Sequence, residues 1–176
     1  MLTKFFDGVT VGEFFNEDWT RQKGEAGRTL EPGHQFEWAW ILSTHQRLKG
    51  GDLSREIAAL TNFAECFGVD PATQVAFDGI SPEGEIISAS SRSWPNTERI
   101  KAWVALAHKA ELQPIERING SLDLLFDRYF GASCPGLWVD RFDGQGAPMV
   151  SVVPASILYH IFLAFAEVLR LECAAE

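Results

Sequence analysis

The chain of 176 residues is poor in cysteine, and its cysteines are poorly placed for a structural role. Cys66, Cys134 and Cys173 are an odd number, lie far apart and form no C-x-x-C pair. This spacing argues against a disulfide framework and against a cysteine-based zinc site, and it is typical of reduced thiols. We therefore expect a protein of the cytoplasm.

Basic charge and long apolar runs are scarce as well. Lys and Arg total 15 against 24 Asp and Glu, a net charge of −9 that argues against nucleic acid or an anionic membrane as partner. The longest apolar run, residues 157–166, is too short to span a bilayer. Asp7 and Glu13 interrupt the apolar residues near the N-terminus, so no signal peptide is expected. The sequence predicts a soluble protein.

The chain does contain regular helical periodicity, and its length suits one domain over residues 1–176. Turn residues and hydrophobic spacing predict short extended segments in residues 1–20, a loop at 21–30, and five helices at about 36–48, 54–67, 95–112, 114–130 and 157–173. They also predict a hairpin near 75–87 and a strand pair within 134–148. This order predicts an all-α stack of helix hairpins, in which alternate helices share one layer and begin at one end.

The densest group of functional side chains is the stretch 31–40, which reads EPGHQFEWAW. The Pro-Gly pair marks a turn, and His34 and Glu37 are three residues apart, so on a helix they share a face. A carboxylate beside an imidazole fixes its tautomer and holds its pKa near working pH. We predict that His34 is a general base paired with Glu37. An ordinary amphipathic helix start with a packed interior is the structural alternative.

Two further polar groups precede alternate helices, at Trp94 and at His160. If alternate helices begin at one end, His34, Trp94 and His160 converge there. Two imidazoles facing one carbon suit proton transfer α to a carbonyl, either as epimerisation or as isomerisation. Trp94 packed in the core and His160 as a hydrogen-bonded core residue are the structural alternatives.

The remaining candidate residues are ligand-binding ones. Trp40 and Trp94 offer flat faces to the C–H groups of a sugar, and Glu98 offers a carboxylate to its hydroxyls. His34, Glu37 and a third ligand lack the compact spacing of a metal site, so we expect no metal and no cofactor.

Three ordered stretches carry a family resemblance. Residues 28–40 (RTLEPGHQFEWAW), 93–98 (SWPNTE) and 158–160 (LYH), with GLWVD at 136–140, resemble the signature stretches of the N-acylglucosamine 2-epimerase superfamily of sugar epimerases and isomerases. The resemblance implies the C-terminal portion of an (α/α)6 barrel, a helix-hairpin toroid that binds a small sugar where these stretches meet. It implies no cofactor.

The resemblance also implies individual roles. The two catalytic histidines fall on His34 and His160, and the carboxylate paired with the first falls on Glu37. The sugar-stacking residues fall on Trp40 and Trp94, and a hydroxyl-binding carboxylate falls on Glu98. Asn96 stands where the family more often has Gln, which leaves the subtype open.

Family members are about twice as long, so we expect a truncated member or a natural half. Its exposed helix faces would then associate with the missing N-terminal half or with a second copy. Two other functions stay open. One is a glycoside hydrolase that uses Glu37 and Glu98 as its carboxylate pair. The other is a non-catalytic sugar-binding or assembly module.

Overall fold

The computed structural model describes residues 3–109, 112–131, 135–149 and 152–174. Cys66 and Cys173 are free and exposed, and Cys134 lies outside the described residues. None of the helices in these ranges combines the length and hydropathy that a membrane crossing needs. The helical elements are α1 (Gly24–Arg28), α2 (Pro32–Lys49), α3 (Ser54–Gly68), α4 (Ser93–Ala105), α5 (Pro114–Leu124), the π-helical η2 (Leu125–Tyr129), the 3-10 turn η3 (Ala155–Ile157) and α6 (Leu158–Cys173).

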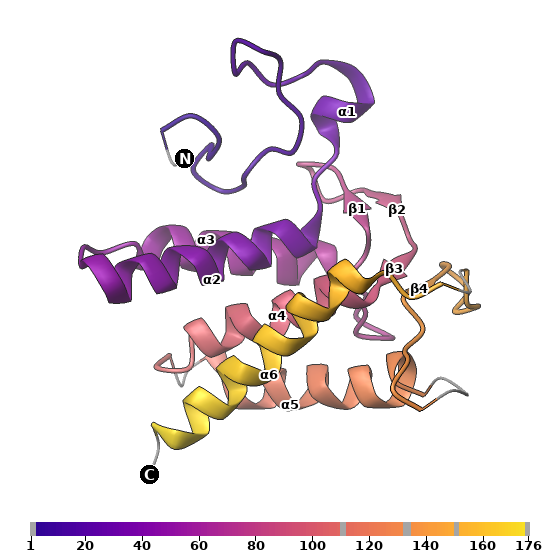
Figure 1. Cartoon of the computed structure of the whole chain (residues 1–176). Coiled ribbons are helices and arrows are strands. Elements are labelled where there is room, and N and C mark those ends of the chain that lie inside the picture. Colours follow the sequence, from indigo (N-terminus) through magenta and orange to yellow (C-terminus); the bar gives the residue numbers. More distant parts are fainter. Residues whose placement is uncertain (1–2, 110–111, 132–134, 150–151, 175–176) are drawn as a thin grey trace.

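The helices form the layers that the sequence predicts. α4 packs against both α2 and α6, while α3 packs against α2 and α5 packs against α4. Figure 1 shows this arrangement, with the starts of α2, α4 and α6 directed toward the side of the molecule that carries the short strands. The alternate helices α2, α4 and α6 therefore belong to one layer, and α3 and α5 cover its back.

The strands differ in part from the sequence prediction. The hairpin is confirmed, because β1 (Gly79–Ile80) pairs antiparallel with β2 (Ile86–Ser88). The strand pair expected within residues 134–148 is instead long-range: β4 (Arg141–Phe142) pairs with β3 (Ser91–Arg92), and only an isolated bridge joins Phe142 to Pro148. Residue 134 of that stretch lies outside the described residues. The β3–β4 pairing fixes the chain that leads directly into α4.

The bounds of several other elements also differ from the sequence prediction. Isolated bridges Phe6–Val11 and Phe15–Arg21 confirm short extended segments at the N-terminus, but residues 24–28 form a helix where a loop was expected. α2 begins at Pro32 rather than residue 36, because Pro suits the first turn of a helix. α4 ends at Ala105, earlier than predicted, and residues 110–111 lie outside the described part.

α4 is the central helix, and all of its residues from Ser93 to Val104 are buried. A helix surrounded on all sides must pair its charged side chains. Arg99, which is 2% exposed, donates from Nε to Glu65 Oε2 of α3 at 2.9 Å, and the same carboxylate pairs with Arg117 of α5 at 2.7 Å. Glu65 therefore ties the back layer to the middle of α4.

A glycine in the first turn of α2 allows α2 to approach α4 closely. A Cβ on Gly33 would lie 2.6 Å from the ring of Trp94 and 3.0 Å from Cβ of Pro95, far inside ordinary contact distance. The indole is buried and cannot swing away.

We expect Gly33→Ala to destabilise the protein by about 1–3 kcal/mol, the usual cost of overpacking a filled core. Urea unfolding measures this change. Gly120→Ala is the matched control, because nothing lies within 4 Å of a Cβ there and alanine favours the helix α5. Equal stability of the two variants would contradict the close packing of α2 on α4.

Candidate active site

Trp94 lies between two imidazole rings that come from distant parts of the chain. Its ring centroid is 5.0 Å from that of His34 in α2 and 5.2 Å from that of His160 in α6. The two imidazole centroids are therefore no farther apart than the sum of these distances. The predicted convergence of His34, Trp94 and His160 is confirmed, and all three lie in the first turns of their helices.

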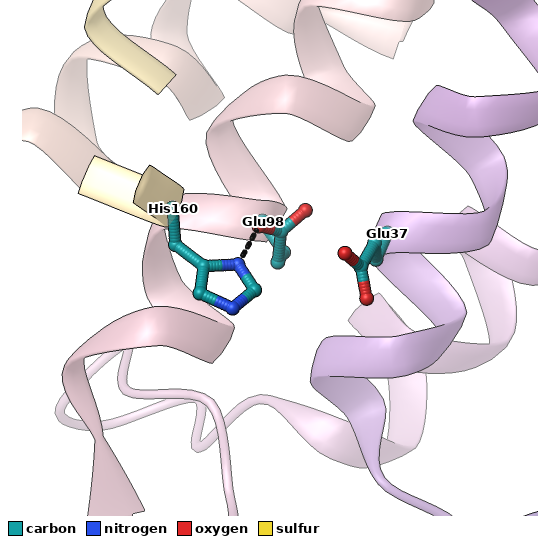
Figure 2. Close-up of side chains that lie close together, drawn as sticks. All are labelled: Glu37, Glu98 and His160. Carbon is teal, nitrogen blue, oxygen red and sulfur yellow. Dashed lines mark hydrogen bonds and ion pairs between the residues drawn. The ribbon is translucent and has the colours of Figure 1, made fainter. Parts of the chain in front are cut away.

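His160 is held by a buried chain of charges, shown in part in Figure 2. Its Nδ1 lies 2.5 Å from Oε1 of Glu98, and Oε2 of Glu98 lies 2.7 Å from Nζ of Lys101. The second contact is an ion pair whose angles are not those of a hydrogen bond. Glu98 and Lys101 are fully buried. When Oε1 of Glu98 accepts this hydrogen bond, Nδ1 of His160 carries the proton and Nε2 is left unprotonated in the neutral ring.

His34 has a similar arrangement, but its partner is not the predicted one. Its Nδ1 lies 2.7 Å from Oε2 of Glu13, and Oε2 of Glu31 is 4.0 Å away. The predicted His34–Glu37 pair is therefore wrong. Its spacing along α2 is correct, but an N-terminal segment distant in sequence brings a nearer carboxylate. Local spacing gave no signal for Glu13, which lies 21 residues before His34.

Glu37 belongs to the His160 side of the site. A carboxylate oxygen of Glu37, one of Glu98 and a ring nitrogen of His160 all lie within 4.8 Å of one another, and Figure 2 shows Glu37 reaching from α2 toward this pair. Burial and the charge of Glu98 raise the pKa of Glu37, although Lys101, His160 and His34 oppose the shift. Glu37 therefore keeps its proton to a higher pH than a free glutamate does.

Within the described part of the chain, these three residues form the one group of side chains that could hold a metal ion. The donor set fits poorly, because both oxygens of Glu98 are already engaged, one by His160 and the other by Lys101. A cation there would be placed beside a buried ammonium of the same sign. The expectation of no metal stays a prediction.

Trp40 and Glu98 do not lie where the sequence prediction placed them. Nζ of Lys101 lies 3.9 Å from the Trp40 ring centroid, and that indole lines a different hollow, shared with Arg47 and Glu167. Glu98 is 0% exposed, so it cannot meet a sugar hydroxyl without rearrangement, and the same burial weakens its assignment as a hydrolase carboxylate. Trp94 is only 5% exposed and offers little surface for stacking.

Asn96, the departure from the family pattern, is a structural residue. Its Oδ1 accepts the backbone N–H of Ala76 at 2.9 Å, and its Nδ2 donates to the carbonyl of Arg92 at 2.8 Å and to the hydroxyl of Tyr129 at 3.1 Å. It is fully buried.

An open hollow of about 390 Å³ lies beside His34. Its walls come from the N-terminal segment and from α2, and they include aromatic residues and two carboxylates: Phe5, Glu13, Trp19, His34, Glu37 and Trp38. The side chain of His34 is 38% exposed, whereas that of His160 is 9% exposed. The hollow gives His34 direct contact with solvent.

The stability of the folded protein depends on the protonation of His34. Burial lowers its pKa, but the hydrogen bond to Glu13 and the charges of Glu13, Glu31 and Glu37 outweigh burial and raise it above 6.5. The folded state therefore binds this proton more tightly than the unfolded chain does. We expect stability from this source below pH 6.5 and its loss as pH rises through the raised pKa. Urea unfolding between pH 6 and 8 checks this, because His34→Gln should flatten that part of the profile.

Comparisons with known proteins show the family of the chain. The family model of N-acylglucosamine 2-epimerase (GlcNAc 2-epimerase) matches residues 4–164. The chain is 32% identical over 172 residues to "Mannose-6-phosphate isomerase" of Rhizobium meliloti (strain 1021), across 94% of this chain and 44% of that protein.

Solved structures share the fold. A D-mannose isomerase superposes with a TM-score of 0.79 at 18% identity, over 93% of this chain and 45% of that one. A cellobiose 2-epimerase from Spirochaeta thermophila DSM 6192 gives a TM-score of 0.68 at 16% identity, over 82% and 39%. The prediction of an all-α fold that forms part of a helix-hairpin toroid is confirmed. The chain spans about half the length, or somewhat less, of the relatives it matches.

Proposed function

The chain belongs to the N-acylglucosamine 2-epimerase family, and from that premise we propose that it acts in a sugar 2-epimerase or aldose–ketose isomerase. The observation that carries the proposal is the pair of imidazoles beside Trp94, each with Nδ1 on a carboxylate. That pattern leaves two Nε2 atoms for proton transfer at neighbouring positions of one small substrate.

The proposed reaction begins with the open-chain aldose. Nε2 of one histidine removes the proton from C2, the electron pair of that C–H bond forms the C1–C2 double bond, and the carbonyl π electrons move to O1. The resulting enediolate either receives a proton on the opposite face of C2 while the C1 carbonyl re-forms, which gives the epimer, or passes the O2 proton to O1 and receives a proton at C1 while the C2 carbonyl forms, which gives the ketose. The first turns of α2, α4 and α6 converge here, and helix N-termini favour the negative charge that develops.

Heavy water separates this reaction from its alternatives. Epimerisation places deuterium at C2 of the product aldose, and isomerisation yields a ketose labelled at C1. A hydrolase would release reducing ends from an oligosaccharide without labelling carbon, and a non-catalytic module would do neither. NMR of the sugar after incubation reads all of these outcomes. Turnover without carbon-bound deuterium would contradict the proposal.

We propose an uncharged sugar as substrate. Among the residues that the structure describes, those that line the hollow beside His34 include Glu13 and Glu37 and no lysine or arginine. The nearby cations Arg92 and Lys101 are each bound to a carboxylate. Mannose, N-acetylmannosamine and mannose 6-phosphate should be compared at equal concentration. Preference for the phosphosugar would contradict this point.

Association is part of the proposed function. Leu158, Phe162 and Leu169 on α6 each expose more than half of their surface. Because the chain spans about half of its relatives, we propose that this face packs on complementary helix hairpins such as those relatives contain. Sedimentation of the chain alone and with such a segment tests this. A stable monomer that does not bind the segment would count against it.

A further inference from the structure

The N-terminal segment contributes a carboxylate that no motif assigns. Oε2 of Glu13 lies 2.7 Å from Nδ1 of His34, and Oε1 accepts the backbone N–H of Glu31 at 3.0 Å. Both oxygens of Glu13 are therefore fixed, and its side chain is only 10% exposed. The contact requires the imidazole orientation in which Nδ1 of His34 faces Glu13.

The segment that carries Glu13 is itself anchored to α2. The fully buried Gln35 accepts the N–H of Val11 through Oε1 at 2.8 Å and donates from Nε2 to the carbonyl of Val11 at 2.9 Å. These two hydrogen bonds hold the backbone two residues before Glu13. The backbone of the folded segment therefore positions the Glu13 carboxylate beside His34.

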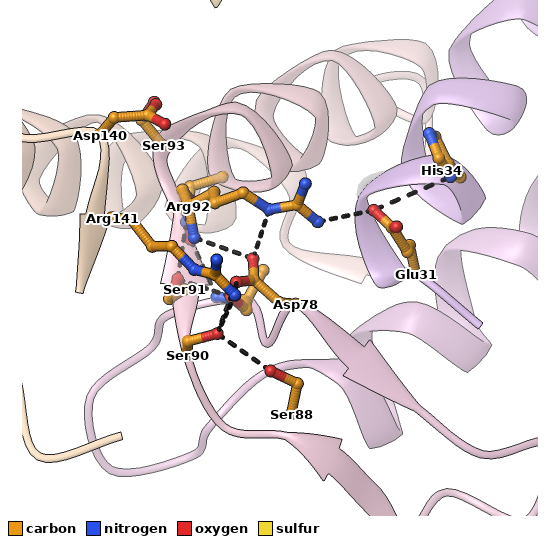
Figure 3. Close-up of polar contacts among 12 residues, drawn as sticks. Glu31, His34, Asp78, Ser88, Ser90, Ser91, Arg92, Ser93, Asp140 and Arg141 are labelled. Atoms are coloured by element: carbon orange, nitrogen blue, oxygen red, sulfur yellow. Dashed lines mark hydrogen bonds and ion pairs between the residues drawn. The ribbon is translucent and has the colours of Figure 1, made fainter. Parts of the chain in front are cut away.

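Glu31 is the other carboxylate near Nδ1 of His34, but it already forms an ion pair with Arg92. Oε2 of Glu31 is 4.0 Å from Nδ1 of His34 and 2.7 Å from a guanidinium nitrogen of Arg92. Arg92 is held in turn by Asp78 at 2.8 Å, and Figure 3 shows this chain of contacts. In the described part of the chain no lysine or arginine forms an ion pair with Glu13. The charge of Glu13 is therefore available to the imidazole.

We propose that Glu13 is the positioning residue of His34: it accepts the Nδ1 proton, holds that tautomer, and leaves Nε2 as the base. The proposal rests on the proposed function only for its catalytic consequence. The groups that face His34 are Glu13 from the N-terminal segment, Glu31 and Glu37 from the start of α2, and the uncharged ring of Trp94 from α4.

The tautomer itself gives the direct test. Nitrogen-15 NMR of the imidazoles in the full chain, at a pH where His34 is neutral, should show Nδ1 protonated and Nε2 free. In Glu13→Gln the amide oxygen can still accept from the N–H of Glu31, which turns the NH2 toward Nδ1. The neutral ring should then shift to the Nε2–H tautomer. A purely structural role for Glu13 would not move this signature.

Turnover gives the second test. Where the wild-type protein labels sugar from heavy water, Glu13→Gln should lower kcat by about 10²-fold or more with little change in KM, because the wrong tautomer cannot act as base. Glu31→Gln is the matched control and should keep the wild-type tautomer and most of kcat. An Nε2–H tautomer in the wild-type chain, or an unchanged Nδ1–H in Glu13→Gln, overturns the proposal whether or not the sugar reaction is found.

Discussion

Replacing His160 by glutamine is expected to lower sugar turnover by about 10²–10⁴-fold, the usual contribution of a general acid–base group. Glutamine can donate to Oε1 of Glu98 as Nδ1 of His160 does, so the buried carboxylate keeps a partner. It cannot accept and return a proton near neutral pH. Deuterium incorporation at C2 of the product aldose or at C1 of the product ketose measures the loss.

The matched control for this variant lies in α2. His45→Gln changes an exposed histidine on the same layer of helices and should leave turnover unchanged. Circular dichroism and the unfolding midpoint verify that both variants are folded. Near wild-type labelling in a folded His160→Gln protein would remove this residue from the proposed mechanism.

The largest effect on stability is expected from Lys101→Met. The substitution removes the ammonium that lies 2.7 Å from Glu98 but keeps an unbranched apolar stem in the same space. Glu98 is fully buried and, within the described part of the chain, would retain only His160 as a partner. Breaking a buried ion pair at one partner typically costs about 3–5 kcal/mol. Urea unfolding at constant pH measures the change in free energy of unfolding.

Two comparisons isolate the buried charge. Glu98→Gln combined with Lys101→Met removes both charges, so the double variant should lose less stability than the two single variants added together. Arg170→Met removes one member of the half-exposed pair with Glu167 and should cost about 0–1 kcal/mol. A cost for Lys101→Met no larger than that of Arg170→Met would show that Glu98 does not depend on the ammonium.

The sequence was sufficient for the order of the helices and for the convergence of three motifs. The hydrophobic spacing in residues 54–67 and 157–173 predicts the bounds of α3 and α6 to within one residue, because each helix buries one face. It was less informative for α4, which is buried all round and whose end was predicted seven residues too late. The convergence of His34 and His160 followed from the rule that alternate helices begin at one end.

The partners of the two histidines were beyond local reasoning. Glu37 is the nearest glutamate C-terminal to His34 along α2, yet Glu13 takes that place because Gln35 anchors a distant segment. Glu98 was predicted to bind a sugar hydroxyl, but its packing between His160 and Lys101 depends on where α6 crosses α4. These contacts are tertiary, and no periodicity within one helix encodes them.

Nitrogen-15 NMR of the imidazoles during titration with mannose tests most directly whether the rings of His34 and His160 serve one substrate. At concentrations that saturate turnover, the account predicts that the ring nitrogens of both residues shift along one common saturation curve while those of His45 do not. A response from only one of the two rings, or from neither, would contradict it.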